Sequence, residues 1–189
     1  MPMHDMNNSQ HFTLPLAGKG EGEVDMIVAC HAWHAILGGE DWQGCIPRAI
    51  DHGFNLGGMH RHSLTILLAD NSRMHDLNRR FGKEDKATNV LAFPATRQQN
   101  QQNHTGYLGD IALGYEAVAA GAYDRGVAIF PHAVHLIVHG VLHLLGYDHQ
   151  HESDASRMEA LESDIMGAIG LPDPHMYADT MRQVANHGR

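Results

Sequence analysis

The sequence FPHAVHLIVHGVLHLLGYDH, residues 130–149, carries the strongest helix signal in this protein. Residues 130–145 predict a helix, because Pro131 stands at a tolerated first-turn position and apolar side chains lie on nearly every side of the helix. A helix of that kind must be buried. We therefore expect it to run through the centre of the core and to end at Gly146.

Three histidines at the end of this segment predict a metal site. His139 and His143 are four residues apart and share one face of the helix. Glycine adopts positive φ without steric cost, so a turn at Gly146 can return His149 to the same point. Three protein ligands leave a fourth tetrahedral position open, which is typical of catalytic zinc. We predict one Zn²⁺ ion at His139, His143 and His149, although imidazole ligands also suit nickel and copper.

The spacing alone is weak evidence, because the chain has 17 histidines and packed or surface histidines would fit it equally well. The apolar surroundings favour the metal, since a buried ring nitrogen without a partner costs roughly 1–3 kcal/mol. His132 and His135 lie further up the helix, and we interpret His135 as a packed residue or one that supports a ligand. His151 is less well placed for the ion. Asp148 either orients an imidazole or caps the helix, and Asp110 is a further candidate to line the site.

The spacing HxxxHxxGxxH also matches the metzincin peptidase pattern HExxHxxGxxH, which raises the alternative of a metallopeptidase. The glutamate of that pattern is the general base for the attacking water, and Gly140 occupies its position here. A hydrolase could still use zinc-bound hydroxide, whose formation has a pKa near 7 in favourable sites. We therefore disfavour a peptidase and look for another substrate.

The segments around the helix predict the α+β class. Short β-branched or alternating runs predict strands, and apolar residues at helical spacing predict further helices. A brief loop before the last strand favours an antiparallel pair there. The expected strands are residues 23–29, 62–69, 89–93 and 107–115, and the other helices are residues 33–50, interrupted at Gly38-Gly39, a helix capped by Asp70, and residues 153–169.

Length and composition predict one domain in a reducing compartment. The chain has 189 residues, 43% of them hydrophobic, which suits a single core. No apolar run reaches the roughly 18–20 residues of a membrane span, and residues 1–22 lack the apolar region of a secretory signal. Cys30 and Cys45 form no disulfide framework. We expect a cytoplasmic protein that does not bind membranes, with a flexible tail over residues 1–22, a single domain over 23–171 and a second tail over 172–189.

The net charge of −9 argues against a general nucleic-acid coat protein, but this average conceals a local asymmetry. Residues 73–97 hold six basic and three acidic side chains, whereas residues 148–164 hold six acidic side chains and one basic. The basic stretch could guide a phosphate backbone toward the metal, or it could be an ordinary solvated helix face.

Four motifs together resemble the YbeY family of endoribonucleases. They span roughly residues 60–170 and occur in the family's order. These are HGVLHLLGYDH at 139–149; LNRRFGKEDKATNVLAFP at 77–94, similar to the family's LNxxYRxxDxPTxVLSFP; LGDI at 108–111; and MEALE at 158–162.

The resemblance implies a mixed sheet with helices on its faces, zinc at the three histidines and hydrolysis of single-stranded RNA. It also implies maturation of the 3′ end of small-subunit ribosomal RNA, ribosome quality control, and ribosomal subunits and assembly proteins as partners. Attack by water and cleavage through the ribose 2′-OH both stay open, and so does the identity of the general base.

One departure from the family pattern bears on catalysis. Gly82 occupies the position of an arginine that is thought in the family to assist catalysis or bind RNA, and Ala87 replaces a proline. We expect Arg80 or Lys83 to supply the missing charge, although a lysine cannot make the bidentate phosphate contact. The loss of the arginine sustains a second alternative, a ribosome assembly factor with little or no catalytic activity.

Overall fold

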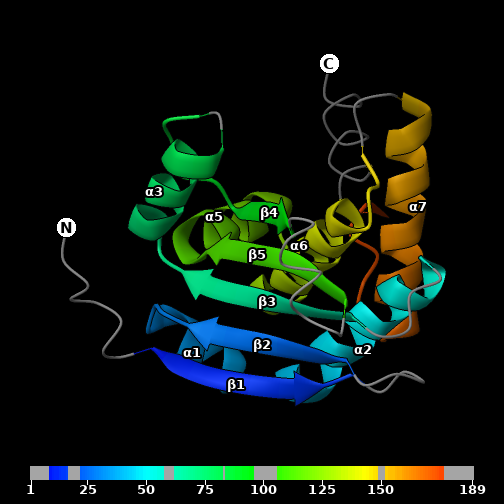
Figure 1. Ribbon diagram of the computed structural model, residues 1–189, viewed down its shortest axis with the longest axis horizontal. Helices are drawn as coiled ribbons and strands as arrows, with labels where there is room; N and C mark the ends of the chain where they lie inside the picture. Colours follow the sequence, from blue (N-terminus) through cyan, green and yellow to red (C-terminus); the bar gives the residue numbers. More distant parts are fainter. Residues whose placement is uncertain are drawn as a thin grey trace.

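The computed structural model describes residues 9–16, 22–57, 62–82, 84–95, 106–148 and 152–176. Within them a five-stranded sheet has the strand order β1-β2-β3-β5-β4, with helices packed on it (Figure 1). The strands are β1 (Gln10–Pro15), β2 (Glu23–Val28), β3 (His62–Ala69), β4 (Val90–Pro94) and β5 (Gly106–Gly114). The helices are α1 (Ala32–Leu37), α2 (Trp42–Leu56), α3 (Asn71–Phe81), α5 (Tyr115–Arg125), α6 (Ile129–Leu144) and α7 (Glu152–Ala168).

The sheet is mixed. Strands β2, β3 and β5 run parallel, while β1 pairs antiparallel with β2 and β4 pairs antiparallel with β5. The predicted α+β class with a mixed sheet is confirmed, as is the antiparallel pairing of the last two strands. Asp70 caps α3 as expected, because its carboxylate accepts a hydrogen bond of 2.8 Å from the Arg73 backbone N–H.

Alternation along the strands divides the core into two layers. Leu64, Ile66 and Leu68 of β3 point into the main core, and Leu67 between them points to the opposite face. That opposite face is covered by α3, whose Met74 is fully buried against it. Helix α3 therefore lies on the other side of the sheet from the main helical layer, well away from α7 (Figure 1).

Helix α6 is the centre of the main core, as predicted. It packs against β4, β5, α2, α5 and α7, and most of its side chains are buried. Gly140 permits its close approach to the sheet, because a Cβ there would lie only 3.0 Å from Ile111 of β5. The helix that carries the histidines is therefore held on several sides by other elements.

Two elements were not predicted. Residues 10–15 were assigned to a flexible tail, but they form the edge strand β1, and Leu14 is buried. Helix α5 was missed because YEAVAAGAYDR is rich in alanine and carries a weak apolar pattern, and only Val118 and Ala122 of it are buried. In both cases contacts with distant segments stabilise an element whose own sequence signal is weak.

No single described helix is long and apolar enough to cross a membrane. Helices α5 and α6 reach that length and composition only when they are taken together, and they meet at an angle of 111°.

Candidate metal centre

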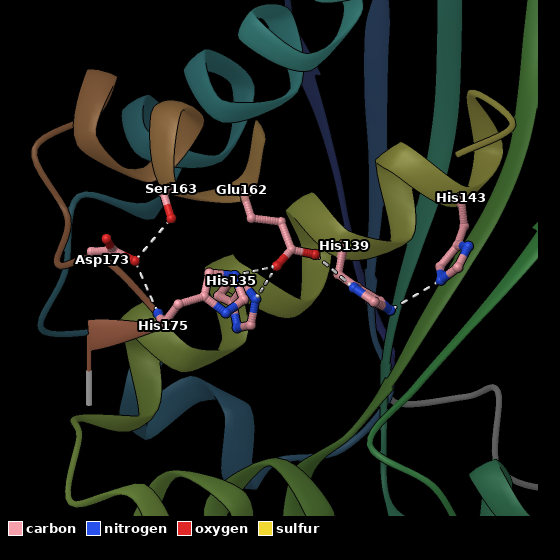
Figure 2. A network of polar contacts seen from close by, with 7 residues as sticks. All are labelled: His135, His139, His143, Glu162, Ser163, Asp173 and His175. Carbon is pink, nitrogen blue, oxygen red and sulfur yellow. Dashed lines mark hydrogen bonds and ion pairs between the residues drawn. The ribbon is translucent and has the colours of Figure 1, made fainter. Parts of the chain in front are cut away.

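Helix α6 brings His139 and His143 together. Their Nε2 atoms lie 3.0 Å apart and their rings are nearly perpendicular, with centroids separated by 4.5 Å. Figure 2 shows both rings on one side of the helix, pointing toward each other. The predicted spacing of four residues has this result because successive turns of a helix place such residues one above the other.

The second nitrogen of each ring is held by a hydrogen-bond acceptor. His139 donates from Nδ1 to a carboxylate oxygen of Glu162 at 2.7 Å, and His143 donates from Nδ1 to the Tyr147 carbonyl at 3.0 Å. A neutral imidazole with Nδ1 protonated carries a lone pair on Nε2. Two lone pairs that face each other at 3.0 Å repel unless a proton on one ring or a cation between the rings intervenes. The arrangement therefore suits a metal ion such as zinc, which separates neighbouring tetrahedral ligand atoms by about 3.3–3.4 Å.

The turn after α6 supplies one of these acceptors. Gly146 has a φ of 91°, the left-handed conformation predicted for it. Hydrogen bonds from Gly146 N to the His143 carbonyl and from Tyr147 N to the Leu142 carbonyl, both 3.0 Å long, close the turn. The turn thereby brings the Tyr147 carbonyl to Nδ1 of His143. The predicted third ligand, His149, lies outside the described residues, and so do His151 and Lys83.

Glu162 holds three histidines of the site, a role that the sequence analysis did not predict. It lies on α7, is only 2% exposed, and accepts hydrogen bonds from His135 at 3.0 Å, from His139 at 2.7 Å and from His175 at 2.8 Å. Burial would raise the pKa of Glu162, but these three hydrogen bonds outweigh it and hold the pKa well below its ordinary value. An available signal was its position between Met158 and Ile165 on the apolar face of a predicted helix.

The segment after α7 joins the same network. Asp173 accepts hydrogen bonds of 2.9 Å from the Ser163 hydroxyl and from the His175 backbone N–H, and His175 reaches Glu162 (Figure 2). The hydrogen bond to Glu162 raises the pKa of His175 above its ordinary value, against the effect of burial. Residues 172–176, which were expected to belong to a tail, are therefore attached to α7. His135, Glu162 and His175 offer ligand atoms within 4.8 Å of one another and could hold a metal ion.

A cavity of about 260 Å³ opens beside His139 and Glu162. Val90 of β4 lines one side and Glu159 of α7 another, with α6 between them. Arg125, at the end of α5, also lines it and brings a positive charge close to the histidines.

Of the two basic residues proposed near the site, Arg80 lies within the described residues and Lys83 does not. Arg80 is exposed near the end of α3, and no hydrogen bond or ion pair found among the described residues joins it to His139 or His143. At Gly82 a Cβ would lie 1.9 Å from Oδ1 of Asn78, a buried residue that donates to the Lys86 carbonyl at 2.8 Å. An arginine at position 82 would therefore require Asn78 to move.

The two aspartates differ in their relation to the site. Asp110 shares a face of β5 with Ala112, which packs under α3, so it lies on the opposite side of the sheet from α6. Its carboxylate accepts a hydrogen bond of 2.5 Å from the Tyr107 hydroxyl. The suggestion that Asp110 lines the site is therefore wrong. Asp148 is exposed, and the acceptors found for His139 and His143 are Glu162 and Tyr147. The two roles considered for Asp148, orienting an imidazole or capping the helix, stay predictions.

The burial of His132 leads us to expect a loss of stability in mild acid. The residue is 4% exposed on α6, and its Nε2 has no hydrogen-bond partner in the described structure. Burial, with help from the charges of Arg125 and His135, lowers its pKa from 6.5 to about 4. Below pH 6.5, His132 therefore becomes protonated in the unfolded chain while it stays neutral in the folded protein. The unfolding free energy falls as the pH drops toward 4.

We expect the difference in the pKa of His132 between the unfolded and folded states to lower the unfolding free energy by about 2 kcal/mol between pH 7 and pH 5. Urea denaturation in a chelating buffer at both pH values measures it. The variant His132→Leu should lose about 2 kcal/mol less than wild type over the same interval, and equal losses in the two proteins would refute the assignment.

Comparison with known proteins gives a consistent result. The family model described as Endoribonuclease YbeY matches residues 32–170. A protein named Endoribonuclease YbeY from Chelativorans sp. (strain BNC1) is 40% identical over 154 residues, which cover 80% of this chain and 92% of that protein. Another of that name, from Rhodopseudomonas palustris (strain ATCC BAA-98 / CGA009), is 43% identical over 162 residues and covers 82% of each chain. The solution structure of TM1509 from Thermotoga maritima aligns with a TM-score of 0.46 at 18% identity, over 71% of this chain and 93% of that one.

Proposed function

This chain belongs to the YbeY family of endoribonucleases, and from that membership we propose that it is a zinc-dependent enzyme that cuts single-stranded RNA. The cellular role we propose is maturation of the 3′ end of small-subunit ribosomal RNA and ribosome quality control in the cytoplasm, with ribosomal subunits and assembly proteins as partners. The observation that carries the zinc proposal is the His139–His143 pair, whose Nε2 atoms face each other at 3.0 Å.

His139, His143 and His149 would hold the ion. When bound, zinc would act as a Lewis acid that polarises a phosphoryl oxygen, and it would make hydroxide available at neutral pH. The chain prepares the site by fixing one tautomer of each described ring. Glu162 accepts a hydrogen bond from Nδ1–H of His139, and the Tyr147 carbonyl accepts one from Nδ1–H of His143. Each Nε2 therefore keeps the lone pair that a ligand needs.

The remaining task of the chain is to bind an RNA phosphate. The cavity beside His139 presents Arg125, whose guanidinium suits a phosphate oxygen. Arg80 and Lys83 stay predicted contributors along the RNA backbone. Arg125 adds a cation that sequence analysis did not select.

Glu162→Gln tests the carboxylate behind the ligand. The glutamine amide has the same shape as the carboxylate but carries no charge. Its NH₂ group can only donate a hydrogen bond, so the side chain cannot accept hydrogen bonds from all three histidines. We expect zinc affinity to fall about 10- to 100-fold. Competition with a chromogenic chelator measures the change. Asp164→Asn on the exposed side of α7 is the matched control, and a Glu162→Gln affinity equal to that of this control would contradict the role given to Glu162.

RNA cleavage with defined substrates tests the enzyme itself. Purified protein of known zinc content is incubated with single-stranded RNA, duplex RNA and single-stranded DNA of one sequence, with and without chelator. We expect cleavage of the single-stranded RNA only, its loss on chelation and its return with Zn²⁺. Products that end in 3′-hydroxyl and 5′-phosphate indicate attack by water, whereas a 2′,3′-cyclic phosphate with a 5′-hydroxyl indicates attack by the ribose 2′-OH.

The assembly-factor alternative predicts a different result. Because Gly82 lacks the family's arginine, the chain could bind ribosomal subunits without cutting RNA. Cosedimentation with subunits together with no cleavage of any substrate would favour that alternative and overturn the nuclease.

A further inference from the structure

We propose that His135, Glu162 and His175 form a second transition-metal site, distinct from the ion proposed at His139 and His143. The three residues come from α6, α7 and the segment that follows α7, and they converge as Figure 2 shows. Their ligand atoms lie within 4.8 Å of one another. Two imidazoles and one carboxylate form a His₂Glu set, which holds zinc in several enzymes and leaves a position open.

The distances are close to those a metal needs. One carboxylate oxygen of Glu162, Oε2, lies 3.0 Å from Nε2 of His135 and 2.8 Å from Nε2 of His175. Zinc bonds of about 2.0–2.1 Å in a tetrahedral arrangement separate neighbouring ligand atoms by about 3.3–3.4 Å. The carboxylate oxygen and each of the two histidine nitrogens would have to move apart by only about half an ångström to admit the ion, and the ligand atoms of His135 and His175 lie within 4.8 Å of each other.

The charge of the cluster also favours a cation. The Glu162 side chain is 3% exposed, and its partners His135 and His175 donate hydrogen bonds but bring no charge while they are neutral. A buried carboxylate without a compensating positive charge is costly. A divalent ion at this point would compensate it, and a proton on His175 is the competing way to do so.

His175 is positioned by contacts other than those with its proposed fellow ligands. Asp173 links the Ser163 hydroxyl to the His175 backbone N–H, with both hydrogen bonds at 2.9 Å. Because Ser163 is next to Glu162 on α7, this link holds the segment against the carboxylate. The site is therefore organised before an ion arrives.

An ion also has a route to the cluster. A cavity of about 230 Å³ reaches His135 and is bordered by Pro172 and Pro174, which flank the anchored Asp173. The larger cavity beside His139 also reaches His135 and Glu162. The carboxylate thus connects the two sites, because its Oε1 accepts from His139 while its Oε2 belongs to the proposed cluster.

Counting bound metal tests the proposal. Metal-free full-length protein is titrated with Zn²⁺ in competition with a chromogenic chelator, and the count is repeated with Co²⁺, which is followed by its visible absorption. The variant His175→Gln keeps a hydrogen-bond donor for Glu162 but lacks the imidazole. His143→Ala removes a ligand of the first site only. His52→Ala, an exposed histidine of α2, controls for surface binding.

We expect two equivalents in wild type and in His52→Ala, one in His175→Gln, one in His143→Ala, and none in the double variant of positions 143 and 175. Equal counts in wild type and His175→Gln, or no metal in His143→Ala, would overturn the second site and leave a hydrogen-bond network alone. Circular dichroism checks that each variant folds.

A crystal soaked in Zn²⁺ gives an answer that does not depend on the variants. An anomalous peak bonded to Nε2 of His175 is the expected result, and a fully occupied first site with no such peak overturns the proposal. Neither readout uses RNA cleavage. Failure of the second site is therefore distinguishable from failure of the nuclease.

Discussion

His139→Ala is expected to abolish RNA cleavage, with a loss of at least about 1,000-fold in kcat/KM. The change removes one of two imidazoles whose Nε2 atoms face each other at 3.0 Å, so His143 is left to bind the ion without its nearest partner. Lewis-acid stabilisation of the transition state is worth several kcal/mol, and each 1.36 kcal/mol is a tenfold change in rate. Single-turnover cleavage of a labelled single-stranded RNA measures the loss.

Two controls make this result specific. His52→Ala removes an exposed histidine of α2, and its cleavage rate should equal that of wild type. The zinc content of His139→Ala should fall in parallel with its activity. Cleavage by His139→Ala at the wild-type rate, in the presence of chelator, would identify a contaminating nuclease and leave the proposed enzyme without support.

Gly140→Glu is expected to unfold the protein or to lower its unfolding free energy by about 4 kcal/mol or more. A Cβ at position 140 would lie 3.0 Å from two carbon atoms of Ile111 and 3.2 Å from a third, in the contact between α6 and β5. The carboxylate would enter an apolar layer without a partner, which combines overpacking with the burial of a charge. Urea denaturation at neutral pH measures the loss.

Gly167→Glu is the matched control, because Gly167 lies on the exposed side of α7 with no atom within 4 Å of its expected Cβ. We expect that variant to be as stable as wild type within about 1 kcal/mol. A Gly140→Glu protein as stable as wild type would contradict the close contact inferred between α6 and β5. The structure explains why this chain lacks the peptidase glutamate: the side chain at position 140 would point at the sheet.

The prediction of α6 from sequence succeeded because its signals are local. Apolar residues on every side of a helix require burial wherever the helix lies, and a separation of four residues places His139 and His143 together in any helix. The left-handed turn at Gly146 follows from the same short segment. These features do not depend on what packs against them.

Elements with weak local patterns were not predicted. Strand β1 is held by its antiparallel register with β2, and α5 is held by its packing against α6. The assignment of Asp110 to the site failed for a related reason. The LGDI motif places Asp110 beside residues of the core, but strand alternation directs its side chain to the face under α3.

The central buried helix, the pair of histidines on one of its faces and the turn that follows it can all be predicted from the sequence, because helix geometry and glycine φ act over a few residues. The turn also supplies the Tyr147 carbonyl that holds His143, but the group that holds His139 depends on tertiary contacts. Glu162 is 23 residues from His139 and His175 is 13 residues beyond Glu162. Their meeting depends on how α7 and the segment after it pack on α6, and such packing is the sum of many contacts that no local pattern contains.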